Sequence, residues 1–241
     1  MKRFLVLFLV AGLSMMWAQG KKKGMGGQPN TLTAQEQKDG WELLFDGKSM
    51  EKWDVTPELA KVWSVVDGTI KCDSSAAGGT LLTKEDFPDF ILRAEFRANP
   101  DVNSGIMLRN PRPHPVDPSA DPKAKKKAGG GQGYEVQIRD KDPGHYSGGS
   151  FLTASLVNVQ KAPETAKIKP GEWNTFEITA QGDHFVIIYN GQQVVDAHDS
   201  KLTNGAIGLQ LAHPEDARGA DIEFRSIKIK RLSAGGATTG K

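Results

Sequence analysis

The chain has 241 residues, with 31 Lys or Arg against 29 Asp or Glu. This balance excludes the basic footprint of a nucleic-acid-binding protein and a charge field that would steer the chain to anionic membranes. Cys72 is the single cysteine, so an internal disulfide is excluded and the hydrophobic core must stabilise the fold by itself.

The N-terminus has the pattern of a secretory signal peptide. Lys2 and Arg3 precede an apolar run over residues 4–16, and Ala18 provides a small residue at the expected cleavage point. Signal peptides contain about 7–15 apolar residues, whereas a membrane-spanning helix needs about 20. We therefore predict that residues 1–18 are removed on export to the periplasm or the medium, with no stable membrane insertion.

Two polar segments flank the expected domain. Residues 19–37 are rich in Lys, Gly and Gln, and residues 233–241 in Gly, Ala and Thr. Segments of this composition bury too little apolar surface to offset the entropy lost on ordering. We predict a flexible linker over residues 19–37, one domain over residues 38–232, and a disordered tail over residues 233–241.

Apolar and polar residues alternate through much of the domain. Residues 90–97 have an apolar residue at every even position, and residues 134–139, 176–179 and 222–225 show the same two-residue period. This period is typical of strands with one buried face. No stretch has the apolar spacing of an amphipathic helix, so the sequence predicts an all-β fold.

Turn signals refine this prediction. Asn190-Gly191 lies between two strand-like runs and favours a type I′ hairpin turn. Alternation fails after Phe224, and a β-bulge near residues 225–226 would restore it. Many short strands separated by turns predict an antiparallel two-sheet β-sandwich, or jelly roll.

Residues 111–131 interrupt the strand pattern with five prolines, three consecutive lysines and three consecutive glycines. A loop of this length in a compact domain is usually functional or disordered. Two interpretations stay open: a mobile solvated insertion, or a lid over a site between the flanking strands.

Familiar catalytic motifs are absent from the sequence. It contains no Gly-x-Ser-x-Gly elbow, no His-Glu-x-x-His, no phosphate loop and no dinucleotide glycine fingerprint. The five histidines lack metal-ligand spacing. What remains is a carboxylate, a guanidinium, three amides and an imidazole on otherwise apolar strands: Glu135, Arg109, Asn103, Gln137, Gln210 and His213.

Solvent exposure explains any one of these residues, because antiparallel strands present polar side chains outward by default. As a group they suit a sugar, since each hydroxyl needs a donor and an acceptor. The sequence therefore indicates a carbohydrate-binding face.

Seven motifs follow one another along the chain, at residues 40–49 (GWELLFDGKS), 63–68, 89–97, 103–109, 133–138 (GYEVQI), 171–175 and 205–210. Each motif is weak alone, but their order resembles the 3-keto-disaccharide hydrolase family over residues 40–232. The resemblance implies a concanavalin A-like, laminin-G-like sandwich and glycoside substrates oxidised to a ketone at C3.

The chemistry of such a substrate suggests residue roles. A C3 ketone acidifies the C2 proton, so a base can remove it, the aglycone can leave from C1, and water can add to the enone. We assign the base to Glu135 or His213, and stabilisation of the enolate to Arg109. A divalent metal is the alternative electrophile, although no ligand set for it is evident.

Substrate hydroxyls would be held by Asn103, Gln137 and Gln210. Asp46 is a further candidate, but Phe-Asp-Gly favours a structural turn. A carbohydrate-binding module without turnover is the alternative function, and an interaction protein using residues 111–131 is the third. Clustering of the polar residues in one pocket would favour the enzyme, and exposed aromatic side chains would favour the binding module.

Overall fold

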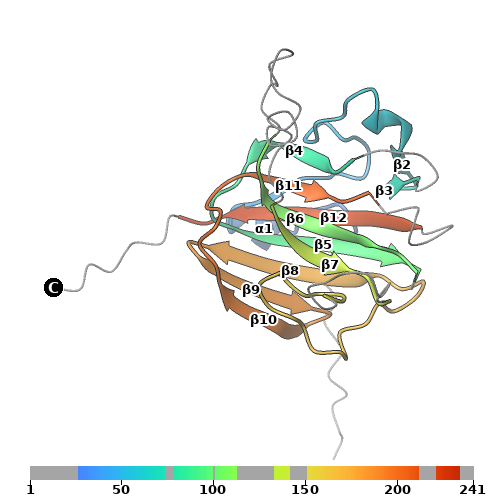
Figure 1. Cartoon of the computed structure of the whole chain (residues 1–241). Coiled ribbons are helices and arrows are strands. Elements are labelled where there is room, and N and C mark those ends of the chain that lie inside the picture. The colour runs from blue at the N-terminus through green and yellow to red at the C-terminus, as the bar shows by residue number, and fades with distance from the viewer. Residues whose placement is uncertain are drawn as a thin grey trace, which may run out of the picture.

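Two antiparallel β-sheets pack against each other in this protein (Figure 1). The computed structural model describes residues 27–73, 79–99, 101–112, 133–141, 151–211 and 221–233. Within them, helix is limited to α1 (Ala34–Lys38) and the 3₁₀ turn η1 (Leu59–Lys61). The predicted all-β sandwich is confirmed.

The large sheet has eight strands, and β12 lies near its centre. The path runs β10 (Gln192–His198), β9 (His184–Tyr189), β8 (Asn174–Gln181), β5 (Phe90–Ala98), β12 (Ile222–Arg231), β3 (Thr69–Cys72) and β2 (Trp63–Val66), with β1 (Trp41–Leu43) also paired to β12. Strands that are far apart in the sequence are therefore neighbours in the sheet, as in jelly rolls.

The small sheet has four strands and carries the candidate site. Its order is β4 (Leu81–Asp86), β11 (Ala206–Leu209), β6 (Ser104–Asn110) and β7 (Tyr134–Ile138). Extended segments form hydrogen bonds with both edge strands of the small sheet. The backbone N–H of Asp54 donates to Leu82 O on β4, and that of Val157 donates to Glu135 O on β7. Paired edges leave few backbone groups free for aggregation.

The core forms from the alternating residues of both sheets. On β5 the even-numbered residues are at most 4% exposed, as the sequence predicts. Phe96 stacks on Phe176 with ring centroids 5.4 Å apart, and Tyr189 lies 5.0 Å from Phe176. Each fully buried side chain of this size contributes about 1.5–3 kcal/mol, so the core stabilises the domain without a disulfide.

Both predicted irregularities are present. Asn190 and Gly191 adopt φ of 50° and 82°, which is the backbone that a type I′ turn requires. The register of β12 against β5 shifts between Arg225 and Lys228, and Ser226 has φ of 50° at this bulge.

The N-terminal segment corrects one prediction. From residue 27 onward it is ordered on the large sheet, rather than a linker to residue 37. Asn30 Oδ1 accepts the backbone N–H of Ser226 at 2.8 Å, and both carboxylate oxygens of Glu36 in α1 accept from Lys228 Nζ at 3.0 Å. The contacts are polar, which is why a search for apolar periodicity misses them.

Several predicted segments lie outside the described residues: the signal peptide, most of residues 111–131, and the tail from residue 234. Among the residues that are described, no helix has the length and apolar character needed to cross a membrane.

Candidate active site

The outward face of the small sheet gathers several of the predicted site residues. Strand pairing places Glu135 opposite Met107 and Gln137 opposite Gly105, so these side chains share one face. Gln210 joins them from the end of β11, because its backbone N–H donates to Gly105 O at 2.9 Å. The structure therefore brings Glu135, Gln137 and Gln210 together.

Glu135 lies against the sheet over Gly105. A Cβ atom at residue 105 would be 2.9 Å from Glu135 Oε1 and 3.1 Å from the backbone oxygen of Val136. The carboxyl group thus occupies space that any other residue at position 105 would fill.

Burial raises the pKa of Glu135 to about 7, while the charge of Arg139 and a hydrogen bond with Gln210 act in the opposite direction. A carboxyl group with this pKa is present in both protonation states near neutral pH. It can therefore accept a proton from a carbon acid and later return it, as general acid–base catalysis requires.

Arg139 is the cation that the sequence analysis missed. It follows β7 with the same strand parity as Glu135 and Gln137, and it is only 5% exposed. Its Nη2 donates to Phe151 O at 3.2 Å, and its backbone N–H donates to Thr153 Oγ1 at 3.0 Å. Parity with Glu135 was the sequence signal that could have identified it.

The predicted amide side chains are largely buried. Asn103 and Gln137 are 4% and 5% exposed, and Gln137 Oε1 accepts the N–H of Ile138 at 3.0 Å. Gln210 Oε1 is buried, yet it accepts no hydrogen bond within the described part of the chain. Because buried polar atoms normally have partners, this oxygen is suited to accept a ligand hydroxyl.

Arg109 does not belong to the site. Its Nε donates to Pro88 O at 2.8 Å, its Nη1 to Gly182 O at 2.7 Å and Leu202 O at 2.8 Å, and its Nη2 contacts Asp89 Oδ1 at 3.2 Å. Burial lowers the pKa of Arg109, and the charge of Asp89 opposes this. The guanidinium joins loops of the sandwich, so its prediction as enolate stabiliser is wrong.

A β-bulge in β6 explains why strand alternation predicted the wrong face for Arg109. Met107 and Asn110 pair with Gly208 and Ala206, so β6 has one residue more than β11 in this interval. Arg109 adopts φ of 48° there. An extra residue reverses the faces beyond it, and the Arg109 side chain turns inward.

Asp46 forms a turn, in agreement with the favoured interpretation. Its Oδ1 accepts the backbone N–H groups of Lys48 at 2.8 Å and Ser49 at 2.9 Å. The hydrogen bonds from Ser49 and Lys48 hold the pKa of Asp46 below its usual range. The other candidate base, His213, lies outside the described residues.

The model of the 3-keto-α-glucoside-1,2-lyase-like domain matches residues 40–230. The chain belongs to this family. The match confirms the resemblance inferred from the seven motifs.

Solved structures share the fold of this 3-keto-α-glucoside-1,2-lyase-like domain. Two proteins of Parabacteroides distasonis, each named as a candidate glycosyl hydrolase, are 22% and 24% identical, with TM-scores of 0.65 and 0.58. The alignments cover 86% and 80% of this chain and 100% and 99% of theirs. No curated protein matches.

A third similar structure is the lumenal domain of VIP36 in a form bound to Ca²⁺ and Man3GlcNAc. It is 11% identical with a TM-score of 0.54, and the alignment covers 83% of this chain and 91% of that one. These likenesses show the fold, and the concanavalin A-like sandwich is confirmed.

The described residues of the 3-keto-α-glucoside-1,2-lyase-like domain contain no group of three or more His, Cys, Asp and Glu side chains that could hold a metal ion. Their polar face instead combines one carboxyl group, one guanidinium and three amides.

Proposed function

We propose that this protein is an exported enzyme that cleaves 3-keto-glycosides, including 3-keto-disaccharides, by elimination followed by hydration. The observation that carries the proposal is Glu135, a half-buried carboxyl group with a pKa of about 7 on a polar face of the small sheet. Membership of the family supports a carbohydrate substrate. Export rests on the signal pattern of residues 1–18.

Elimination begins at C2 of the oxidised sugar. Glu135 in its ionised form takes the C2 proton, and the electron pair of the broken C–H bond moves into the enolate of the C3 ketone. The enolate then re-forms the C3 ketone and a C1=C2 double bond while the C1–O bond breaks. The aglycone oxygen keeps the electron pair of that bond and takes the proton held by Glu135. Water adds its hydroxyl at C1 and a proton at C2, so the net reaction is hydrolysis.

Arg139 takes the electrophilic role that sequence analysis gave to Arg109. It is the cation whose charge acts on Glu135, and it is buried on the same side of β7. A guanidinium in a low-dielectric site stabilises charge that develops on an oxyanion. The amides of Asn103, Gln137 and Gln210 would hold the sugar hydroxyls.

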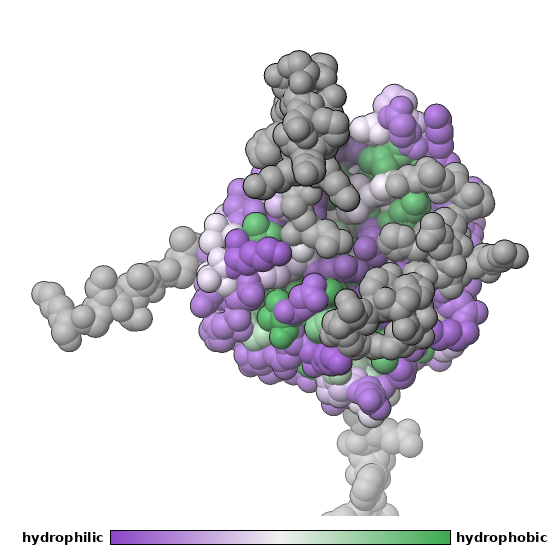
Figure 2. Space-filling view, viewed as in Figure 1, coloured by the Kyte–Doolittle hydropathy of each residue, from purple (hydrophilic) through white to green (hydrophobic). Residues whose placement is uncertain are grey.

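A sugar-binding module without turnover is the alternative function. The sugar-bound form of the VIP36 domain shows that a protein of this fold can bind glycans. In the described part of this chain, however, Val66 is the exposed large hydrophobic residue, and no Trp, Tyr or Phe is exposed. Figure 2 shows apolar residues in small separate patches on the coloured surface. The face around Glu135 thus offers a carboxyl group suited to acid–base chemistry, and its aromatic neighbour Phe151 is half-buried.

Product analysis tests the proposal. The purified protein is incubated with a 3-keto-disaccharide and with its unoxidised parent, each with and without chelator. We expect a 3-keto-monosaccharide from the oxidised sugar alone, and loss of product in Glu135→Gln. Binding of both sugars without cleavage of either would contradict the enzyme and favour the module. Loss of activity with chelator would show that a metal takes part.

A further inference from the structure

A second cavity, lined by charged and apolar side chains, opens at the opposite edge of the small sheet from Glu135. It has a volume of about 190 Å³ and is lined by residues of both sheets and of the segment beside β4: Glu42, Leu44, Glu51, Lys52, Thr83, Lys84, Glu85, Phe87 and Arg231. Strand order places β4 and β7 at the two edges of the small sheet, so this cavity is separate from the candidate active site.

The cavity has rigid walls. Leu44, Thr83 and Phe87 are 4%, 1% and 1% exposed. The indole N–H of Trp53 donates to Leu44 O at 2.8 Å, and the backbone N–H of Lys84 donates to Lys52 O at 2.8 Å. Such contacts preform the space, so a ligand would not have to order it.

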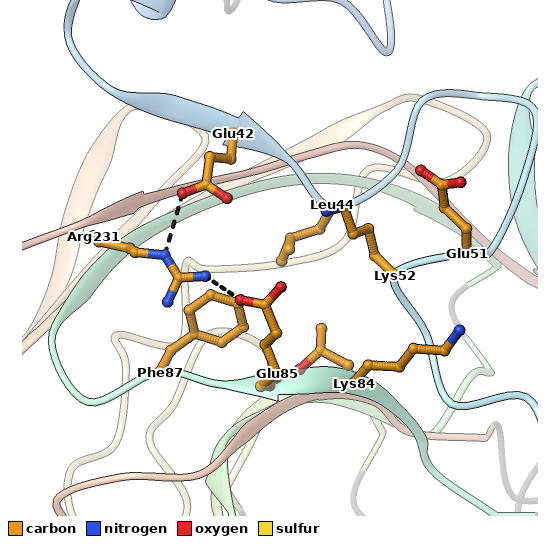
Figure 3. A pocket seen from close by; sticks show the side chains of 9 residues that line it. Glu42, Leu44, Glu51, Lys52, Lys84, Glu85, Phe87 and Arg231 are labelled. Atoms are coloured by element: carbon orange, nitrogen blue, oxygen red, sulfur yellow. Dashed lines mark hydrogen bonds and ion pairs between the residues drawn. The ribbon is translucent and has the colours of Figure 1, made fainter.

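One side of the cavity is an ion-pair bridge between the two sheets. Arg231 at the end of β12 donates through Nε to Glu42 on β1 at 3.2 Å, and through Nη2 to Glu85 on β4. Its guanidinium lies 4.6 Å from the ring centroid of Phe87. Figure 3 shows this bridge beside the open space, with Lys84 and Glu51 on the other side.

The charged groups suit a neutral ligand rich in hydroxyls. Three carboxylates face three cations, so the lining has no net charge to select an anion or a cation. Within the described part of the chain, the side chains of Glu51, Lys52 and Lys84 have no ion-pair or hydrogen-bond partner. Hydroxyl groups can donate to the carboxylate and accept from the ammonium groups, and hydrogen bonds to charged partners are the strong ones.

The size of the cavity limits the ligand to a single sugar ring. A volume of about 190 Å³ is smaller than the roughly 300–1,000 Å³ of cavities that take drug-sized ligands, so it suits one small ring rather than an extended glycan. We propose that this cavity is a second carbohydrate-binding site, which takes a single neutral sugar unit independently of the chemistry at Glu135. It would hold a glycoside or the end of a glycan without cleaving it.

Protein-observed NMR on the purified Glu135→Gln variant tests the proposal, because turnover at the first site is then blocked. The probes are methyl glucoside as the neutral sugar, glucuronate as the anion and glucosamine as the cation. We expect saturable shifts of the backbone amides of Thr83, Lys84 and Glu85 with methyl glucoside, and weaker binding of both charged probes.

A double variant, Lys84→Met with Glu85→Gln, should weaken methyl glucoside binding at these amides by about tenfold or more, which is the loss of about 1.4 kcal/mol. The matched control, Glu164→Gln with Lys167→Met, changes the same residue types on a distant exposed loop and should bind as the parent does. Lys52→Met gives a second test if the double variant is poorly folded.

Unchanged affinity in both cavity variants, equal or tighter binding of glucuronate or glucosamine, or shifts confined to the face around Glu135 would each overturn the proposal. Failure of the glycosidase assay would not overturn this proposal, because sugar binding at the second cavity is measured in a variant that lacks the catalytic carboxylate.

Discussion

Gly105 and Glu135 form one unit on the face of the small sheet, because the carboxylate of Glu135 lies where a side chain at residue 105 would have to be. A Cβ at residue 105 would come within 2.9 Å of Glu135 Oε1. The glycine lets the carboxyl group lie flat against the sheet and reach the region of Gln210. Its burial, and hence its raised pKa, follow from this arrangement.

Gly105→Ala should therefore displace the Glu135 carboxyl group. A misplacement of about 1 Å in an active site can cost roughly 100-fold in rate, so we expect kcat/KM to fall by about 10–100-fold with little loss of fold. Gly79→Ala is the control, because a Cβ there would meet its nearest neighbour, Leu59 Cδ2, at 3.8 Å. Equal activity of the two variants would show that Gly105 does not position Glu135.

The pH dependence of kcat/KM should report the titration of Glu135. The base must be ionised, and its pKa is about 7, so activity should rise as pH increases through 7 and level off above it. Glu135→Gln should lose about 10²–10⁴-fold in activity at the optimum. A rising limb near pH 4.5 would assign the base to a group other than Glu135.

Glu135 should also make stability depend on pH. The pKa of Glu135 in the folded protein, about 7, exceeds the ordinary value of 4.5, so its contribution to stability is fully present below pH 4.5 and is lost as pH rises through 7. Glu135→Gln should then match the wild type at pH 4 and be more stable by up to about 3 kcal/mol at pH 8. Denaturant unfolding at both pH values checks this, and a gain of equal size at pH 4 would contradict it.

Arg139 should set the pKa of its neighbour. Its charge acts to lower the pKa of Glu135, so Arg139→Met should shift the rising limb of activity up by about one pH unit. The same variant should lower kcat, because the developing enolate loses its cation. Arg139→Lys keeps the charge and should keep the position of the limb. If the rising part of the pH–activity profile keeps its position in both variants, Arg139 does not act on Glu135 and has no place in the proposed mechanism.

Arg109 should act on stability rather than on turnover. Arg109→Met breaks a buried ion pair with Asp89 and removes donors from three carbonyl groups, so we expect a loss of about 3–5 kcal/mol. Arg97→Met is the control, since its ion pair with Glu223 is partly exposed and should contribute no more than about 1 kcal/mol. Full stability of Arg109→Met with loss of activity would restore Arg109 as a catalytic residue.

The alternation of side chains determined much of the architecture by itself. A two-residue period reports directly which face of a strand is buried, and it identified the strands around Phe90 and Tyr134. Local chemistry also determined the turn at Asn190-Gly191 and the bulge at Ser226, because positive φ and broken parity depend on neighbouring residues alone. The order of the motifs was enough to identify the family.

The tertiary structure alone decided which polar residues share a site. A bulge in β6 turns Arg109 inward, and its partners come from loops 20 to 93 residues away. The pKa of Glu135 depends on burial by strands and segments that are distant in sequence. Position along a strand is a local property, whereas burial and charge pairing are sums over the whole fold. Alternation could therefore predict the face of the sheet on which Glu135 lies, but not the inward turn of Arg109.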